Sequence, residues 1–206
     1  EDIRDNNIDH YGEIWAQALP LLPVEGGTLT GCLSDLQGAF NINSFKYYDN
    51  SPIQGELDDF EKIGFAKVWL NLLELLSIPV NPGRVYAIKD WIDADDSAGS
   101  WGAEQADYEG LENSVVVYND LFVSSSELSA VMGYTIEEVN KLMPWLSALP
   151  FQTPININTA SVEILNSLSG NYGPAFIEAV LSGRPFSNVN DFYNQINEYL
   201  ALWDPI

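Results

Sequence analysis

The chain has 206 residues, of which 8 are Lys or Arg and 30 are Asp or Glu, so its formal net charge is −22. Eight basic residues cannot form a broad face that neutralises phosphates, which argues against binding to nucleic acid or to an anionic membrane surface through charge. With 46% hydrophobic and 12% aromatic residues, the chain has enough apolar surface to fold as one large domain or two small ones.

The first half of the chain shows helical and then strand-like patterns. Apolar residues recur at three- and four-residue spacing over residues 8–22, which predicts a helix that Pro20 and Pro23 end. Rough alternation then predicts one strand over 28–36 and a second over 39–43. The polar stretch that follows is expected to be a loop.

The middle and second half are predicted to be mainly helical. An apolar face predicts a strong helix over 60–78, whereas the type of 85–92 is left open. Two capping boxes predict helix starts, one at Ser124 with Glu127 and one at Thr135 with Glu138. Three more helices are expected: one capped by Asn158 or Thr159, one over Pro174–Gly183, and one beginning near Val189.

Residues that could act as a nucleophile or a base are few. His10 is the single histidine and is expected on the polar side of the first helix, facing solvent. Cys32 is the single cysteine, so no intrachain disulfide forms, and its apolar neighbours predict a buried free thiol. No catalytic triad, phosphate-binding loop or zinc spacing is present. Thirty acids allow many carboxylate pairs, so a carboxylate-dependent hydrolase stays open.

The most unusual stretch lies at residues 90–120, with nine acids and no base. Asp93, Asp95 and Asp96 place three carboxylates within four residues, which repel one another unless they are exposed or neutralised. Calcium binds six to eight oxygens, and alternate Asp residues in a loop that contains glycine can supply them. The pattern is not an EF-hand, so either a calcium loop or a solvated acidic loop fits it.

A second pattern lies at 155–165, Ile-Asn-Ile-Asn-Thr-Ala-Ser-Val-Glu-Ile-Leu. Together with the turn before Pro174 it resembles a helix-hairpin-helix unit, which presents backbone N–H groups to phosphate. Arg184 is the one base near it, so a small helical packing module is the favoured interpretation. A nucleic-acid module is kept as an alternative.

Five motifs, taken together and in order, resemble the minor pseudopilin K family of type II secretion (general secretion pathway protein K). They are Leu22-Pro23-Val24-Glu25-Gly26-Gly27-Thr28, residues 35–43 (Asp-Leu-Gln-Gly-Ala-Phe-Asn-Ile-Asn), Asp90-Trp91-Ile92-Asp93-Ala94-Asp95 with Gly102-Ala103-Glu104, Ser126-Glu127-Leu128, and Ile155-Asn156-Ile157-Asn158-Thr159-Ala160. The resemblance covers about residues 11–195.

The resemblance implies an α+β fold. It consists of a pilin-like N-terminal helix packed on a small antiparallel sheet, plus a large inserted all-helical domain. We expect residues 1–48 to form the pilin-like helix and first strands, and 49–206 the mainly helical domain. The family also has C-terminal strands, expected beyond Ile206, and a membrane-embedded half of the first helix, expected before Glu1.

The resemblance also implies a function. It predicts a structural, non-catalytic subunit at the tip of the periplasmic pseudopilus, anchored in the inner membrane. Its partners would be the minor pseudopilins I and J, with the major pseudopilin left open as another. The implied cofactor is Ca²⁺, and its ligands carry over to Asp93, Asp95, Asp96, Glu104 and Asp107, with Asp90 as an addition. Gln105 departs from the family, which has an acid at that position.

Overall fold

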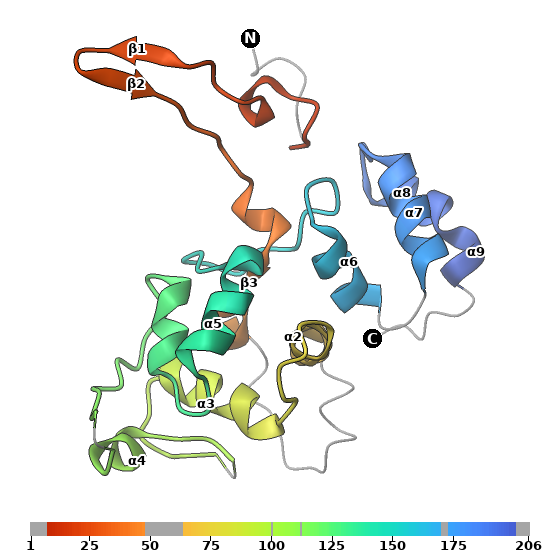
Figure 1. The fold of residues 1–206 in the computed structure, drawn as a ribbon. Coiled ribbons are helices and arrows are strands. Elements are labelled where there is room, and N and C mark those ends of the chain that lie inside the picture. Colours follow the sequence, from red (N-terminus) through yellow and green to blue (C-terminus); the bar gives the residue numbers. More distant parts are fainter. Residues whose placement is uncertain (1–7, 48–63, 100, 112, 170–172, 201–206) are drawn as a thin grey trace.

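The computed structural model describes residues 8–47, 64–99, 101–111, 113–169 and 173–200 (Figure 1). Helices make up most of the regular structure, and the described strands form two separate two-stranded sheets. The predicted α+β class is therefore confirmed. The α-helices are α2 (Gly64–Leu75), α3 (Pro82–Ile92), α4 (Gln105–Glu109), α5 (Ile136–Leu142), α6 (Val162–Ser169), α7 (Pro174–Gly183), α8 (Val189–Gln195) and α9 (Asn197–Leu200). The 3₁₀ helices are η2 (Ile14–Ala16), η3 (Leu36–Gly38), η4 (Ile42–Tyr47), η5 (Ser125–Ala130) and η6 (Met143–Trp145).

The predicted helix over residues 8–22 is wrong. Its described part holds turns and the single 3₁₀ turn η2. The buried Glu13 carboxylate accepts hydrogen bonds from the His10 N–H (2.9 Å) and the Trp15 Nε1–H (2.8 Å), which closes a local turn in place of helical bonds. A helix is stabilised mainly by burying its apolar face. Every residue from 17 to 34 is exposed here, so no described surface covers that face.

The strands pair differently from the prediction. β1 (Leu22–Val24) and β2 (Gly27–Leu29) form an antiparallel hairpin whose turn contains Gly26 at φ +85°. This hairpin extends away from the helices (Figure 1). The strand expected over 28–36 therefore ends early, and Cys32, which follows it, is exposed rather than buried. The strand expected over 39–43 is only β3 (Phe40–Asn41), and it pairs in parallel with β4 (Leu146–Ser147).

The core gathers around α2 and the segment that contains β3. α2 packs on α6, and η4 packs on α3. The Trp69 ring lies 5.3 Å from the Phe40 ring, and its Nε1–H donates to the buried Tyr134 hydroxyl at 3.1 Å. The Tyr134 hydroxyl in turn donates to the Arg84 carbonyl at 3.1 Å, which connects these residues to α3, the helix that leads into the acidic stretch. The predicted 60–78 helix is confirmed over Gly64–Leu75, while its first residues lie outside the described part.

Capping residues set most of the later helix boundaries. Both predicted capping boxes are confirmed, at Ser124 for η5 and at Thr135 for α5. α7 has the predicted bounds, and α8 begins at the predicted residue. The predicted cap of α6 is wrong, because the Ser161 hydroxyl accepts the Ile164 N–H at 3.2 Å.

The predicted domain boundary at residue 48 falls in a stretch outside the described residues, so it stays a prediction. Among the described helices, none is both long and apolar enough to cross a lipid bilayer.

Candidate metal centre

Helix α3 places two acids at its C-terminal end. Asn81 caps the helix start by accepting the Gly83 N–H at 2.8 Å, and Pro82 occupies the first turn. Asp90 lies in the last turn and is 4% exposed, and Asp93 is the C-cap. Residues three apart on a helix lie on the same face, so the two carboxylates leave α3 on one side.

The returning loop folds over the Asp90 carboxylate. Asp90 Oδ2 accepts the Gly99 N–H at 3.2 Å, and the Ala103 N–H also stabilises the charged form. A Cβ added at Gly102 would overlap Asp90 Oδ2, so only glycine allows this close approach. The glycine of the Gly-Ala-Glu motif therefore has a steric role beside the site.

Glu104 then completes a cluster of three carboxylates. Oxygens of Asp90, Asp93 and Glu104 all lie within 4.8 Å of one another. Glu104 is 3% exposed, and neither of its carboxylate oxygens has a hydrogen-bond partner among the residues that the structure describes; the same holds for the buried Asp93 Oδ1. A buried carboxylate without a partner is strongly unfavourable. The described residues therefore supply no hydrogen-bond partner for these carboxylate oxygens.

The electrostatics of the cluster agree with this geometry. Burial, and after it the charges of Asp90, Asp93, Asp95 and Asp96, together raise the pKa of Glu104 to about 7. Burial raises the pKa of Asp90 to about 6, with a smaller contribution from Asp93. The pKa of Asp93 is also raised, first by burial and then by Asp95, against a smaller effect of Lys89.

A divalent cation fits these residues. The donors are carboxylate oxygens, the ligands that Ca²⁺ prefers, and a cation among them would supply the missing partner for Glu104. It would also offset the burial of the three carboxylates and the repulsion from neighbouring acids, which together raise their pKa values.

The structure brings together two of the five ligands expected from the sequence, Asp93 and Glu104, and adds Asp90. Asp95 and Asp96 lie on the exposed loop after α3, close enough to Glu104 to influence its pKa. Asp107 is exposed, and its Oδ2 accepts the Glu104 N–H at 2.9 Å, so it holds the start of α4. The three-residue spacing of Asp90 and Asp93 is the sequence signal that favours Asp90 over Asp107 as a candidate metal ligand.

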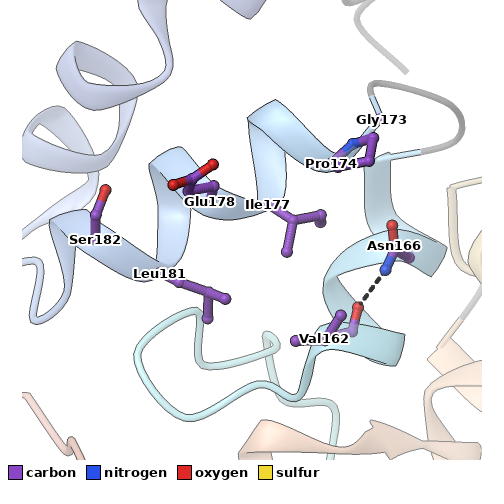
Figure 2. Close-up of a pocket in the computed structure, with 8 residues that line it drawn as sticks. All are labelled: Val162, Asn166, Gly173, Pro174, Ile177, Glu178, Leu181 and Ser182. Atoms are coloured by element: carbon purple, nitrogen blue, oxygen red, sulfur yellow. Dashed lines mark hydrogen bonds between the residues drawn. The ribbon is translucent and has the colours of Figure 1, made fainter.

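The helix-hairpin-helix segment holds a groove between α6 and α7 (Figure 2). It has a volume of about 750 Å³ and is lined by Val162, Asn166, Gly173, Pro174, Ile177, Glu178, Leu181 and Ser182. The one charged lining residue is acidic, and Pro174, in the first turn of α7, has no N–H to offer a phosphate. The lining of this groove therefore favours apolar packing over nucleic-acid binding.

The structure is thus an α+β protein, mostly helical, with a cluster of three carboxylates at the C-terminal end of α3. The family described as "Type II secretion system (T2SS), protein K" matches residues 38–151 and 155–198. The chain belongs to this family.

Individual relatives support the same assignment. Type II secretion system protein K of Aeromonas hydrophila is 35% identical over 195 residues, covering 90% of this chain and 58% of the relative. The protein of the same name from Pseudomonas aeruginosa is 28% identical over 198 residues, covering 93% and 56%. The chain therefore spans somewhat more than half the length of these relatives.

A solved structure shares the fold. It is a chain from the crystal structure of the GspK-GspI-GspJ complex of the enterotoxigenic Escherichia coli type 2 secretion system. It aligns with a TM-score of 0.75 and 24% identity, over 92% of this chain and 66% of that one.

Proposed function

We propose that the Asp90–Asp93–Glu104 cluster binds Ca²⁺ and holds the loop between α3 and α4 in place. The observation that carries the proposal is Glu104, whose two carboxylate oxygens are buried without a partner. Asp95 and Asp96, two and three residues after Asp93 in the loop, are the candidates for further oxygens. When bound, the ion supplies positive charge and no chemistry of its own.

Calcium that binds the folded loop and not the unfolded chain stabilises the fold by mass action. The test is thermal melting of the protein in a chelator and in excess calcium. A higher melting temperature in calcium than in magnesium is expected, because the smaller Mg²⁺ demands a stricter octahedral arrangement. Equal melting in chelator and calcium would remove the metal from the account.

We further propose that the full-length protein is a non-catalytic minor pseudopilin at the tip of the type II secretion pseudopilus. Membership of the protein K family carries this proposal. The crystal structure that shares the fold is described as a complex of GspK with GspI and GspJ, which supports minor pseudopilins I and J as partners. A broad helical domain at the end of a thin fibre would block the addition of further subunits above it.

This role implies a location and an anchor. The helical domain would lie in the periplasm, and a segment outside this sequence would hold the protein in the inner membrane. The subunit would assist pseudopilus assembly and export of proteins across the outer membrane. The charge of −22 is compatible with partners that are proteins rather than nucleic acid.

Complex formation tests the assembly role. The full-length periplasmic region would be mixed with the I and J subunits from the same organism, and the mass of the product measured by light scattering after gel filtration. A complex that contains all three subunits is expected in calcium. Three separate peaks under these conditions would contradict the proposed role, whatever the outcome of the melting experiment.

A further inference from the structure

The segment after α4 is hydrogen-bonded along one edge by a single side chain. Gln105, the first residue of α4, accepts the Val117 N–H at its Oε1 (2.9 Å) and donates from its Nε2 to the Val115 carbonyl (3.4 Å). One residue of a parallel neighbouring strand bonds in the same way to the two residues that flank its partner. The Gln105 amide therefore takes the place of a strand beside Val116.

The opposite edge of the segment is open. Successive residues of an extended chain offer their N–H and C=O groups to opposite edges, so Val116 and Tyr118 offer theirs on the side away from Gln105. Within the part of the chain that the structure describes, the backbone of neither residue forms a hydrogen bond. Unpaired N–H and C=O groups in a row are the feature by which an edge strand accepts another strand.

The side chains of the segment suit the addition of a strand. Val117 is 8% exposed and belongs to the core, whereas Val116 is 80% exposed and Tyr118 is 67% exposed. Valine and tyrosine are both enriched in strands, where they pack against side chains of the neighbouring strand. A strand added at the open edge would therefore gain apolar contacts with Val116 and Tyr118 as well as backbone hydrogen bonds.

The charges at the ends of the segment indicate which strand fits. Residues 113–119 carry no charge. Exposed acids lie on either side of them in the sequence, Glu109 before and Asp120 after. Asp96 is close as well, because its Oδ1 accepts a hydrogen bond from Asn119 Nδ2 at 3.2 Å. An added strand thus meets an uncharged middle with negative charge toward its ends.

This charge pattern favours a basic partner over a second copy of the chain. A second copy would bring the same acids and a further net charge of −22, which opposes association. Lys46 already pairs with Asp120 at 3.1 Å, but the Asp120 side chain stays 59% exposed and can accept a second cation. Basic residues at the ends of an added strand would complement these acids.

We propose that residues 115–118 form a docking edge for an extended segment of a partner protein, with β-branched residues in its middle and Lys or Arg at its ends. Backbone hydrogen bonds from Val116 and Tyr118 would supply affinity, as in other cases of strand addition, and the flanking acids would supply selectivity. Gln105 holds the other edge of the segment in place. The proposal depends neither on the cation site nor on the role at the pseudopilus tip.

A synthetic peptide is the probe. It is acetyl-Lys-Thr-Val-Thr-Val-Thr-Lys-amide with a fluorophore, and its binding to the 206-residue chain is measured by fluorescence anisotropy. We expect it to bind at least about tenfold more tightly than the same peptide with Glu in place of both lysines. Hydrogen exchange followed by NMR should show slower exchange of the Val116 and Tyr118 amides when the peptide is bound. The Val117 amide, already bonded to Gln105, should change little.

Two changes test whether backbone pairing carries the binding. Val116→Pro removes a donor from the open edge but leaves the groups that bond to Gln105, so peptide affinity should fall about tenfold or more. Val116→Thr keeps the N–H and the β-branched side chain, so it is the matched control and should bind as the wild type does. A peptide methylated at two successive central amide nitrogens tests the same bonds without altering the protein, and we expect it not to bind.

Three outcomes would overturn the proposal. Equal binding of the methylated and unmethylated peptides would mean that charge alone attracts the probe. No binding of either lysine peptide would mean that the flanking acids only keep the edge unpaired. A concentration-dependent dimer that Val116→Pro abolishes, detected by light scattering, would make a second copy the occupant instead. None of these results would alter the melting test of calcium or the assembly test with subunits I and J.

Discussion

At the scale of single residues, the main feature of the acidic cluster is the buried Glu104 carboxylate, which accepts no hydrogen bond from the described residues. Glu104 is as buried as many core side chains, yet neither of its carboxylate oxygens accepts a hydrogen bond from the described residues, and the ionisable neighbours that shift its pKa are acids. A folded protein rarely leaves such a group unpaired, because the cost of desolvating a charge exceeds most single favourable contacts. The cluster is therefore the place where the proposed cation would contribute most to the stability of the fold.

Replacing the Glu104 carboxylate by an amide should change stability in opposite directions with and without calcium. In metal-free protein, Glu104→Gln removes one charge and supplies an N–H₂ that can donate to Asp90 and Asp93. We expect the free energy of unfolding to rise by about 1–2 kcal/mol. In excess calcium the variant should lose most of the increase in unfolding free energy that calcium gives the wild type. Urea denaturation in both conditions measures this.

Glu109→Gln, at an exposed position of α4, is the matched control and should leave both values unchanged. A Glu104→Gln variant that is less stable than the wild type in chelator would show that Glu104 is satisfied within the chain.

Gly102 gives a steric test of the same site. Gly102→Ala would place a methyl group against the Asp90 carboxylate, so the loop or the carboxylate must move. We expect a loss of about 1–3 kcal/mol in the free energy of unfolding, the usual range for overpacking, together with weaker calcium binding. Gly110→Ala is the control, because a Cβ there meets no atom within 4 Å and its φ is −81°. Equal melting of the two variants would mean that Asp90 is not held where the structure has it.

At the scale of the elements, local chemistry explains what the sequence could predict. Capping boxes at Ser124 and Thr135, and Pro174 before an apolar run, act within four residues, so their helix starts were predicted correctly. The N-terminal apolar stripe was misread, because periodicity reports a face that could be buried and not whether a surface exists to bury it. The β3–β4 pairing joins Phe40 to Leu146, a partner that no local pattern specifies.

At the candidate site, too, the sequence predicted the features that depend on neighbouring residues and missed those that depend on distant contacts. The crowding of acids at 93–96 and the Gly-Ala-Glu motif indicated its location, and the helical spacing of Asp90 and Asp93 was readable once 85–92 was known to be helix. The roles of Asp107 as a backbone acceptor and of Asn119 beside Asp96 depend on how loops return to α3. Nothing in residue spacing encodes that return.

The α5 cap provides a prediction at this scale. The Thr135 hydroxyl accepts the Glu138 N–H at 3.3 Å, and Glu138 accepts the Thr135 N–H at 3.0 Å while also pairing with Arg84 at 2.8 Å. Thr135→Ala should cost about 1 kcal/mol of unfolding free energy, the usual value of an N-cap. Thr135→Ser should retain nearly all of it. Chemical denaturation in calcium measures both; equal loss in the two variants would assign the effect to the threonine methyl group instead.

At the scale of the whole molecule, a charge of −22 and a buried acidic cluster act in the same direction. Net charge of one sign opposes the compact state, and the cluster adds a local repulsion that burial intensifies. A bound cation, as proposed, would offset both the net charge and the local repulsion. The stability of the domain should accordingly depend on pH with opposite trends in the metal-free and metal-loaded protein, and the carboxyls with raised pKa values determine the window.

In the metal-free protein, Asp90 and Glu104 have folded-state pKa values of about 6 and about 7, above their ordinary values of 3.8 and 4.5. Between the ordinary and the folded-state pKa values, the folded chain binds more protons than the unfolded chain. The contribution of Asp90 and Glu104 to the free energy of unfolding is therefore full at low pH and is lost as the pH rises through 6 to 7. Calcium needs the ionised carboxylates, so its affinity should rise over the same interval.

The measurement is urea denaturation of chelator-treated, desalted protein at several pH values between 5 and 8, for the wild type and for Asp90→Asn/Glu104→Gln. Other carboxyls with lowered pKa values, such as Glu138, contribute the opposite slope and are common to both proteins. The difference between the two curves therefore isolates the cluster. We expect the wild type to lose stability relative to the double variant as pH rises, and calcium to reverse that loss. Parallel curves would mean that the two carboxylates ionise in the folded protein as they do in the unfolded chain, and that no cation is needed to hold them together.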